Sequence, residues 1–354
     1  MGTPPLPASR RRRGRELGIA AAGAVLAGGA GYAASRLAAH RKQLGRRPGG
    51  EPELQLPADA AEHMVEMSDK GRIRVVEAGK GPAIVLLHGA GLSADVWAYQ
   101  FHDLCDRRRL VALDLRAHGE SEAGGEGVTI SAMADDLASV LEELDLRGAL
   151  LVGHSMGGMA VLRFARRHAG VLAERVAAVA LVSTTGGLTP ASSPWHRAGN
   201  LAGRTAVAFD RVLNPAGRHI YPGGELGYLA TRAAFGARPT LVEVEATARL
   251  LRRMQPARFV GLLPELLAFD ERGTYSDLKV PVTVLVGSRD LLTPPAHARL
   301  LAKALPGARL LVWPGAGHMI MYERRKAFDW LLETLSAGGG RSLGEDPGEA
   351  RAVQ

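Results

Sequence analysis

Several residue types and motifs are scarce in this chain, and each scarcity excludes a class of protein. Cys105 is the single cysteine among 354 residues, so no disulfide can form within the chain. Neither Cys-x-x-Cys nor His-Glu-x-x-His occurs, so the sequence implies no structural or catalytic zinc, and we expect no cofactor. Acidic residues are nearly absent from the first fifty positions, which hold ten Arg or Lys and only Glu16.

The positive charge of the chain belongs to its N-terminal segment. The formal net charge is +8, residues 1–50 carry a local charge of +9, and the remaining residues sum to −1. No nucleic-acid-binding motif accompanies the basic residues. The excess therefore indicates a basic tail rather than a binding surface on the folded part, and we expect no nucleic-acid partner.

Large aliphatic side chains are few in the uncharged run from Leu17 to Ser35, which follows the basic residues 1–16. Its nineteen residues would span roughly 28 Å as a helix, close to the thickness of the hydrocarbon core of a bilayer. Eight of them are alanine, five are glycine and only four are Leu, Ile or Val. Each large aliphatic side chain contributes at best ~0.6 kcal/mol to the free energy of membrane insertion, so the composition of this run makes membrane insertion marginal.

Three interpretations of this run stay open. We favour a membrane anchor, so that the protein associates with a membrane through residues 17–35. A secretory or twin-arginine signal is the second, because Ser9-Arg10-Arg11 precedes the run and Gly31-Tyr32-Ala33 supplies small residues for cleavage. The third is a surface helix or tail on a cytoplasmic protein. Basic residues flank both ends of the run, so the positive-inside rule predicts no orientation.

The strongest chemical signal is a serine between glycines at the end of an apolar run. Ala149 to Val152 has the composition of a buried strand, Gly153-His154-Ser155-Met156-Gly157 follows, and Met159 to His168 has the pattern of a helix. A strand, a sharp G-x-S-x-G turn and a helix form a nucleophile elbow, which presents the serine hydroxyl at the carboxyl end of a sheet. Ser155 is therefore the candidate nucleophile.

Candidate partners for Ser155 occur later in the chain. A serine hydroxyl is a weak nucleophile, so it needs a base and a group that orients the base. Asp290 follows a buried strand predicted at Val282–Gly287, and His318 follows a strand predicted at Arg309–Trp313. Both side chains would lie at strand ends, in the chain order nucleophile, acid, histidine. Asp290 and His318 are therefore the candidate acid and base.

Backbone donors for an oxyanion are predicted at two places. The buried strand Ala83–Leu87 ends in His88-Gly89-Ala90-Gly91, whose glycines permit close approach of the backbone to a reacting group. A nucleophile elbow takes one donor from the residue after the serine, here Met156. It takes the other from the loop after this earlier strand, for which Ala90 is the candidate.

These motifs together resemble the serine α/β-hydrolase superfamily, from about His63 to Leu335. The matching segments are HGAG at 88–91, DLRAHGES at 114–121, GHSMGG at 153–158, GSRDLLTP at 287–294 and GAGHM at 315–319. Ala117 departs from the family, which usually has glycine there. The resemblance extends to actinobacterial members with an Ala/Gly-rich hydrophobic N-terminus. It implies a fold and a triad of Ser155, Asp290 and His318, and it leaves the substrate open.

The sequence predicts the α/β class and, through the resemblance, the α/β-hydrolase fold. A hairpin of His63–Met67 and Arg72–Glu77 precedes alternating strands and helices, which indicate a mostly parallel sheet flanked by helices. The alternation stops between Ser183 and Asp277, which predicts a helical cap inserted after the sixth strand. The expected domains are a basic tail (1–16), a hydrophobic segment (17–35), a linker (36–62), the hydrolase domain (63–336, with the cap at about 184–277) and a disordered C-terminal tail (337–354).

The resemblance implies a serine hydrolase that cleaves a small-molecule carboxylic ester, with an acyl or similar hydrophobic group, through an acyl-enzyme. Relatives with an aspartate nucleophile are disfavoured, because residue 155 is serine. Thioesterase, lactonase, cofactor-free perhydrolase and carbon–carbon hydrolase chemistry stay open, as does a non-catalytic binding protein on this fold. Apolar residues of the cap could line the pocket; the candidates are Trp195, Phe209, Tyr228, Phe235, Phe259 and Phe269.

Overall fold

The computed structural model describes residues 54–187, 224–254, 256–271, 273, 275 and 278–338. The chain divides into two compact units, Met1–Arg47 and Pro48–Gln354, and all described residues belong to the second. The hydrophobic run at 17–35, most of the predicted linker and nearly all of the C-terminal tail lie outside the described residues. Within the described ranges, no helix is both long enough and apolar enough to cross a membrane.

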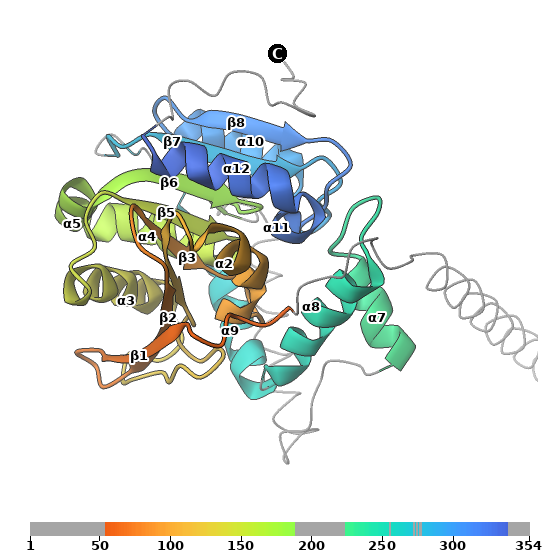
Figure 1. Cartoon of the computed structure of the whole chain (residues 1–354), viewed down its shortest axis with the longest axis horizontal. Coiled ribbons are helices and arrows are strands. Elements are labelled where there is room, and N and C mark those ends of the chain that lie inside the picture. The colour runs from red at the N-terminus through yellow and green to blue at the C-terminus, as the bar shows by residue number, and fades with distance from the viewer. Residues whose placement is uncertain are drawn as a thin grey trace, which may run out of the picture. The chain divides into compact units, whose positions relative to one another are not determined.

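An eight-stranded sheet forms the centre of the second unit, in the order β1-β2-β4-β3-β5-β6-β7-β8 (Figure 1). β1 pairs antiparallel with β2, β2 pairs antiparallel with β4, and every later pair is parallel. The predicted hairpin therefore forms. The strands are β1 (Ala61–Glu66), β2 (Arg72–Ala78), β3 (Ala83–Leu87), β4 (Arg109–Leu113), β5 (Ala149–His154), β6 (Val176–Val182), β7 (Val282–Gly287) and β8 (Arg309–Trp313).

The boundaries of two strands differ slightly from the sequence prediction. β1 begins at Ala61, two residues before the predicted start of the domain, because Ala61 pairs with Glu77 and extends the ladder. The apolar run from Leu110 to Leu115 predicts a strand over those residues, but β4 runs over Arg109–Leu113, because Asp114 leaves the ladder with β3 and accepts the amide of Ala94. Strand ends depend on such pairing and side-chain bonds, which composition does not encode.

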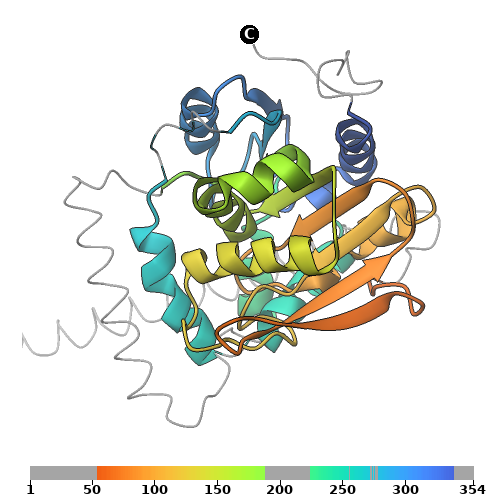
Figure 2. The same cartoon turned by 90° about the vertical axis from the view of Figure 1, so that its left-hand side faces the viewer.

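Helices cover both faces of the sheet (Figures 1 and 2). β4 lies beside β3 on the side of β1, whereas β5 lies on the other side of β3, and β6, β7 and β8 follow in that direction. The direction in which successive strands are added therefore reverses after β4. Because such crossovers are right-handed, the reversal places α2 on one face and α3, α4 and α10 on the other, and α12 packs with α2. The helices are η1 (Ala94–Trp97), α2 (Ala98–Leu104), α3 (Ile130–Glu143), α4 (Met156–Arg167), α5 (Ala169–Arg175), α10 (Pro295–Ala304), α11 (Ile320–Glu323) and α12 (Arg325–Ser336).

Local sequence accounts for the central elements. β3 and β5 are buried at every position, as strands covered on both faces must be. Thr129 is the N-cap of α3, and its hydroxyl accepts the amide of Ala132 at 3.0 Å. The carboxyl ends of β3 and β5 meet at the reversal of strand order, where open α/β sheets bind ligands. The predicted mostly parallel sheet with helices on both faces is confirmed.

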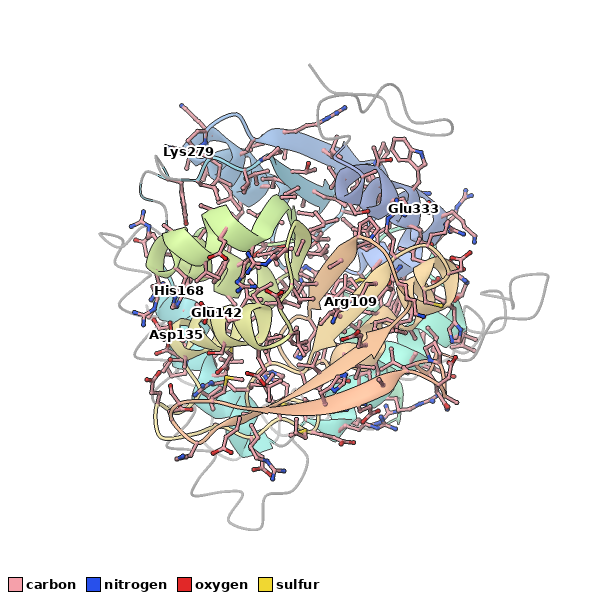
Figure 3. All side chains as sticks on the ribbon, turned by 60° about the vertical axis from the view of Figure 1, so that its left-hand side comes forward. Arg109, Asp135, Glu142, His168, Lys279 and Glu333 are labelled. Carbon is pink, nitrogen blue, oxygen red and sulfur yellow. The ribbon has the colours of Figure 1, made fainter. Side chains whose placement is uncertain are left out.

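Polar contacts join α3 to the C-terminal end of α4. Asp135 of α3 accepts two hydrogen bonds from Arg167, at 2.9 and 2.8 Å, and lies 2.6 Å from Nε2 of His168. Asp135 and His168 lie close together on this side of the molecule (Figure 3). Because α4 begins at the carboxyl end of β5 and ends here, this group is remote from Ser155 and fastens the two helices.

A helical insertion separates β6 from β7, as predicted. Its described helices are α7 (Gly224–Arg232), α8 (Leu241–Arg253) and α9 (Pro256–Ala268). α8 begins with a capping box, in which Thr240 and Glu243 satisfy each other's backbone amides. Of the aromatic residues expected to line a pocket, Tyr228, Phe235 and Phe269 are buried. Trp195, Phe209 and the side chain of Phe259 lie outside the described part of the chain.

The two ends of the insertion are fastened together and to α4. Gly187 forms a β-bridge with Asp270, and the amide of Glu271 donates to the carbonyl of Gly186 at 2.6 Å. The buried carboxylate of Glu271 forms ion pairs with two arginines of α4, Arg163 and Arg166. The two ends of the insertion are therefore fixed to α4, the helix that follows Ser155.

Candidate active site

Ser155 occupies the sharp turn between β5 and α4. Its backbone angles are φ 52° and ψ −117°, a conformation that costs a non-glycine residue about 1–3 kcal/mol. The amide of Ser155 donates to the carbonyl of Val182 at 2.9 Å, which fixes the turn to β6. Met156 is the first residue of α4, so its amide has no acceptor in a preceding helical turn. The turn thus has the geometry of a nucleophile elbow.

Asp290 and His318 come together from the ends of β7 and β8. Nδ1 of His318 lies 2.9 and 3.1 Å from the two carboxylate oxygens of Asp290, and both side chains are buried. An ionised carboxylate can only accept, so we assign the proton of the neutral ring to Nδ1. Nε2 of His318 is then left with the lone pair that can accept a proton.

Asp290 is held in its ionised form by several donors. The amides of Leu292 and Thr293 each donate to Oδ1 at 2.9 Å, and the hydroxyl of Thr293 donates to Oδ2 at 2.9 Å. Burial alone would raise the pKa of Asp290, but the charge and hydrogen bond of His318 and the bonds from Thr293 outweigh burial and lower the pKa. An ionised Asp290 can orient the imidazole and stabilise its protonated form.

A second contact brings the loop of His318 against the turn of Ser155. His154 precedes Ser155, and its Nε2 donates to the backbone carbonyl of His318 at 3.0 Å, with the two ring centroids 4.8 Å apart. Burial lowers the pKa of His154 to about 3, so this ring is neutral at physiological pH. The structure therefore gathers Ser155, Asp290 and His318 at the carboxyl ends of β5, β7 and β8.

The loop after β3 lies directly against Ser155. A Cβ on Gly89 would be 3.1 Å from the Cβ of Ser155, so glycine permits this close approach. Nδ1 of His88 donates to the carbonyl of Gly89 at 2.8 Å, and its Nε2 accepts the amide of Leu115 at 3.0 Å. Burial lowers the pKa of His88 to about 4, which keeps the ring neutral. Ala90, the candidate second donor, follows Gly89 in this fixed loop and is half-buried.

The insertion contacts the loop of His318, which sequence reasoning did not anticipate. The amide of His318 donates to the carbonyl of Ala234, just beyond α7, at 2.7 Å. Glu323 accepts the amide of Gly236 at 2.6 Å and that of Gly317 at 2.8 Å. Burial raises the pKa of Glu323 despite these two donors. The backbone of His318 is thus held by the insertion on one side and by His154 on the other.

Thr184 is a further residue that the sequence analysis missed. It follows β6, is buried, and its hydroxyl donates to the carbonyl of Ser155 at 2.6 Å. No short motif marks this contact, because it joins two segments that only the pairing of β5 with β6 brings together. The one available signal is its place immediately beyond a predicted strand end, which Ser183 and Thr185 share.

A cavity of about 640 Å³ adjoins the loop after β3. Gly91, Leu92 and Ser93 form one side, and Leu250 of α8 and Met254 just after it contribute to another. The described residues that line it do not include Ser155, Asp290 or His318. No cluster of His, Cys, Asp and Glu in the described ranges is arranged to hold a metal ion.

Comparison with known proteins gives a consistent result. A family model described as alpha/beta hydrolase fold matches residues 82–325. The chain is 32% identical over 265 residues to pimeloyl-[acyl-carrier protein] methyl ester esterase of Aromatoleum aromaticum, covering 73% of this chain and 99% of that protein. The structure of the esterase RhEst1 from Rhodococcus sp. ECU1013 is 25% identical with a TM-score of 0.62, covering 80% and 99%. That of the enol-lactonase from Burkholderia xenovorans LB400 is 25% identical with a TM-score of 0.59, covering 77% and 100%.

Proposed function

Since this chain belongs to the α/β-hydrolase fold family, we propose that it is a serine hydrolase that cleaves carboxylic esters through an acyl-enzyme. The observation that carries the proposal is the placement of Asp290 and His318, bonded at 2.9 Å, against the strained turn of Ser155. The esterases among its relatives support the choice of ester as substrate.

In the proposed mechanism, Ser155 is the nucleophile and His318 the base. Oγ of Ser155 bonds to the carbonyl carbon of the ester while its proton passes to Nε2 of His318. Asp290 stabilises the imidazolium that forms, and the amides of Met156 and Ala90 donate to the oxyanion. The imidazolium returns the proton to the leaving alcohol, which departs and leaves the acyl-enzyme. Water then repeats the sequence, releasing the acid and restoring Ser155.

The substrate class we propose is a small ester with an apolar acyl group. From α8, the cavity beside the loop of Ala90 is lined by the apolar Ala246 and Leu250 and by Arg249 and Arg253, so it could contact a hydrocarbon portion next to a polar one. Lactones form a second candidate class, favoured by the likeness to the enol-lactonase. A lactone is a cyclic ester, so the same groups would open it, with the leaving alcohol still joined to the acyl group.

Fluorophosphonate labelling combined with an ester and lactone panel tests this function. We expect the full-length protein to form one covalent adduct at Ser155 and to hydrolyse p-nitrophenyl esters, with chain length and lactone ring size defining the preference. S155A is the matched control and should neither label nor turn over. A folded wild-type protein that forms no adduct and hydrolyses no ester or lactone would overturn the proposal.

We further propose that residues 17–35 associate the protein with a membrane. The support is compositional: an uncharged run of nineteen residues lies between two basic flanks, while the rest of the chain beyond residue 50 is close to neutral. These residues belong to a different unit from the hydrolase fold, so anchoring and catalysis should be separable by truncation.

A further inference from the structure

Each candidate oxyanion donor shares a peptide unit with the carbonyl of the residue before it. A peptide unit is planar, and in the trans form its C=O and N–H point in opposite directions. A group that fixes the carbonyl of Ser155 therefore fixes the direction of the amide of Met156. In the same way, a group that fixes the carbonyl of Gly89 fixes the amide of Ala90.

Three donors bond to the carbonyl of Ser155. The amides of Gly158 and Met159 donate to it at 3.0 and 3.2 Å, as the first turn of any helix would provide. The third donor is the hydroxyl of Thr184, at 2.6 Å, which is the shortest of the three contacts and comes from a distant part of the chain. The side chain of Thr184 is 1% exposed, so this bond is shielded from water.

The absence of a side chain at Gly158 leaves room for the side chain of Thr184. A Cβ on Gly158 would lie 2.7 Å from the side-chain atoms of Thr184, so any larger residue at 158 would displace the threonine. Thr184 is also held by its own segment, because Ser183 donates its amide to the carbonyl of Leu285 at 2.8 Å. Its position therefore does not depend on the bond to Ser155, and removing the hydroxyl should leave the backbone in place.

We propose that Thr184 is a positioning residue for the oxyanion hole and acts on the amide of Met156 through the carbonyl of Ser155. The bond fixes the plane of the peptide, and donation to a carbonyl polarises the N–H of the same unit, which makes it a stronger donor. His88 has the equivalent relation to Ala90, because Nδ1 of His88 donates to the carbonyl of Gly89 at 2.8 Å. This inference rests on the proposed esterase function and extends it.

The position of Thr184 links this effect to the insertion. Thr184 is followed by Thr185, whose hydroxyl donates to the carbonyl of Gly187 at 2.8 Å, and by Gly186, which accepts the amide of Glu271. The segment that supports the amide of Met156 is therefore the same segment from which the insertion starts. Thr185 faces its own turn, and no bond joins its side chain to Ser155 within the described structure.

Three variants with valine or serine distinguish loss of the orienting hydrogen bond from general disruption of the segment after β6. T184V keeps the shape and removes the donor, T184S keeps the donor, and T185V makes the same change one residue further along. We expect T184V to lower kcat about tenfold with KM unchanged, and T184S and T185V to stay within threefold of wild type. The Ki of an alkyl trifluoromethyl ketone, which forms an oxyanion on Ser155, should rise in T184V by the factor that kcat/KM falls.

Active protein is counted in each variant from the endpoint of fluorophosphonate labelling, so misfolded molecules do not enter kcat. A kcat for T184V within twofold of wild type would overturn the inference, as would an equal loss in T185V, which would indicate damage to the segment. A rise in KM with kcat unchanged would also overturn it. A wild-type protein inert to esters and to the label would instead overturn the proposed function, so the two failures are distinguishable.

Discussion

Nε2 of His154 donates a hydrogen bond to the backbone carbonyl of His318, so the residue before the candidate nucleophile holds the loop of the candidate base. The two residues lie 164 positions apart in sequence, and their ring centroids are 4.8 Å apart. The buried side chain of His154 therefore holds the loop of His318 at a fixed distance from the turn of Ser155. It also gives the histidine in G-H-S-M-G a defined role besides filling space.

Replacing His154 by leucine should therefore lower both activity and stability. The carbonyl of His318 would lose its donor in a buried place, which costs about 1–3 kcal/mol of unfolding free energy. We expect the melting temperature to fall and kcat to drop at least tenfold, because the loop of His318 is no longer held at the turn of Ser155. H154Q, whose amide can donate from a similar position, is the control and should recover part of both. Unchanged kcat in H154L would show that other contacts align the loop.

The proposed triad makes a quantitative prediction. S155A should abolish ester turnover, since loss of a nucleophile costs on the order of a millionfold. D290N should keep the fold but lower kcat by roughly four decades, because an amide at this position favours the wrong tautomer of His318. Steady-state kinetics on purified variants measures both, with circular dichroism to check folding.

Retention of activity by both variants would reject Ser155 and Asp290 together. Tolerance of D290N alone would point to another acid, and Asp270 and Asp277 are the alternatives nearest in sequence. Asp270 lies in the bridge with Gly187 at the base of the insertion, and Asp277 lies outside the described residues. The 2.9 Å contact between Asp290 and His318 makes D290N the decisive variant.

A pair of carboxyl groups between α2 and α12, the buried Asp329 and the partly buried Asp103, should make stability depend on pH. Burial raises the pKa of Asp329 to about 8, reinforced by its hydrogen bond to Asp103, whereas bonds from Arg325 outweigh burial and lower the pKa of Asp103 to about 2. In the unfolded chain both groups titrate near pH 4. Between about pH 4 and 8, Asp329 therefore binds a proton in the folded protein that it does not bind in the unfolded chain. The contribution of Asp329 to stability must then fall as the pH rises through this window, whereas that of the buried histidines His88 and His154 rises as the pH passes their unfolded pKa near 6.5.

Urea unfolding at pH 5, 6.5 and 8 measures this effect. The slope for one proton is at most about 1.4 kcal/mol per pH unit. In D329N the amide can donate to Asp103 at every pH, so the stability of D329N relative to wild type should rise between pH 5 and 8. D145N is the control, because Asp145 is an exposed carboxylate bonded to Arg147 and Arg175, and it should leave the pH dependence of wild type unchanged. A stability difference between D329N and wild type that stays constant from pH 5 to 8 would contradict the assignment of a protonated Asp329.

The proposed anchor makes a prediction for cell fractionation. The full-length protein should sediment with membranes and resist carbonate extraction, while a chain lacking residues 1–47 should be soluble and equally active. Substituting Val25 and Leu26 by arginine in the full chain should release it, since each charge costs about 2.5–3.5 kcal/mol at the centre of a membrane helix. A mature protein that begins near Ala34 and is found in the medium would indicate a cleaved signal. Full-length protein in the soluble fraction would reject the anchor.

Residues that act through local motifs could be predicted from the sequence, and residues that act through distant contacts could not. The turn at Ser155 is specified by five consecutive residues between a strand and a helix, so its geometry follows from the motif. Thr184 and Thr185 are chemically identical neighbours, yet one bonds the carbonyl of Ser155 and the other its own turn. Only the register of β5 against β6 distinguishes them.

The insertion shows the same limit on a larger scale. Its helical character and its place after β6 follow from the loss of strand patterns, and the structure has α7, α8 and α9 there. The bond from the amide of His318 to Ala234 and the bridge that Glu323 makes between Gly236 and Gly317 carry no sequence signature. A glutamate with two backbone donors looks like any surface glutamate until the fold buries it.

The contacts of Ala234 and Gly236 with the loop of His318 bear on how such an enzyme could be re-engineered or diverge. An insertion that merely covered the site could be exchanged for one from a relative to change specificity. Here the turn after α7 supplies an acceptor to the amide of His318 and a donor to Glu323, so it helps to hold the loop of the candidate base. A transplanted insertion would have to reproduce those two backbone contacts, and substrate range and proton transfer would therefore change together.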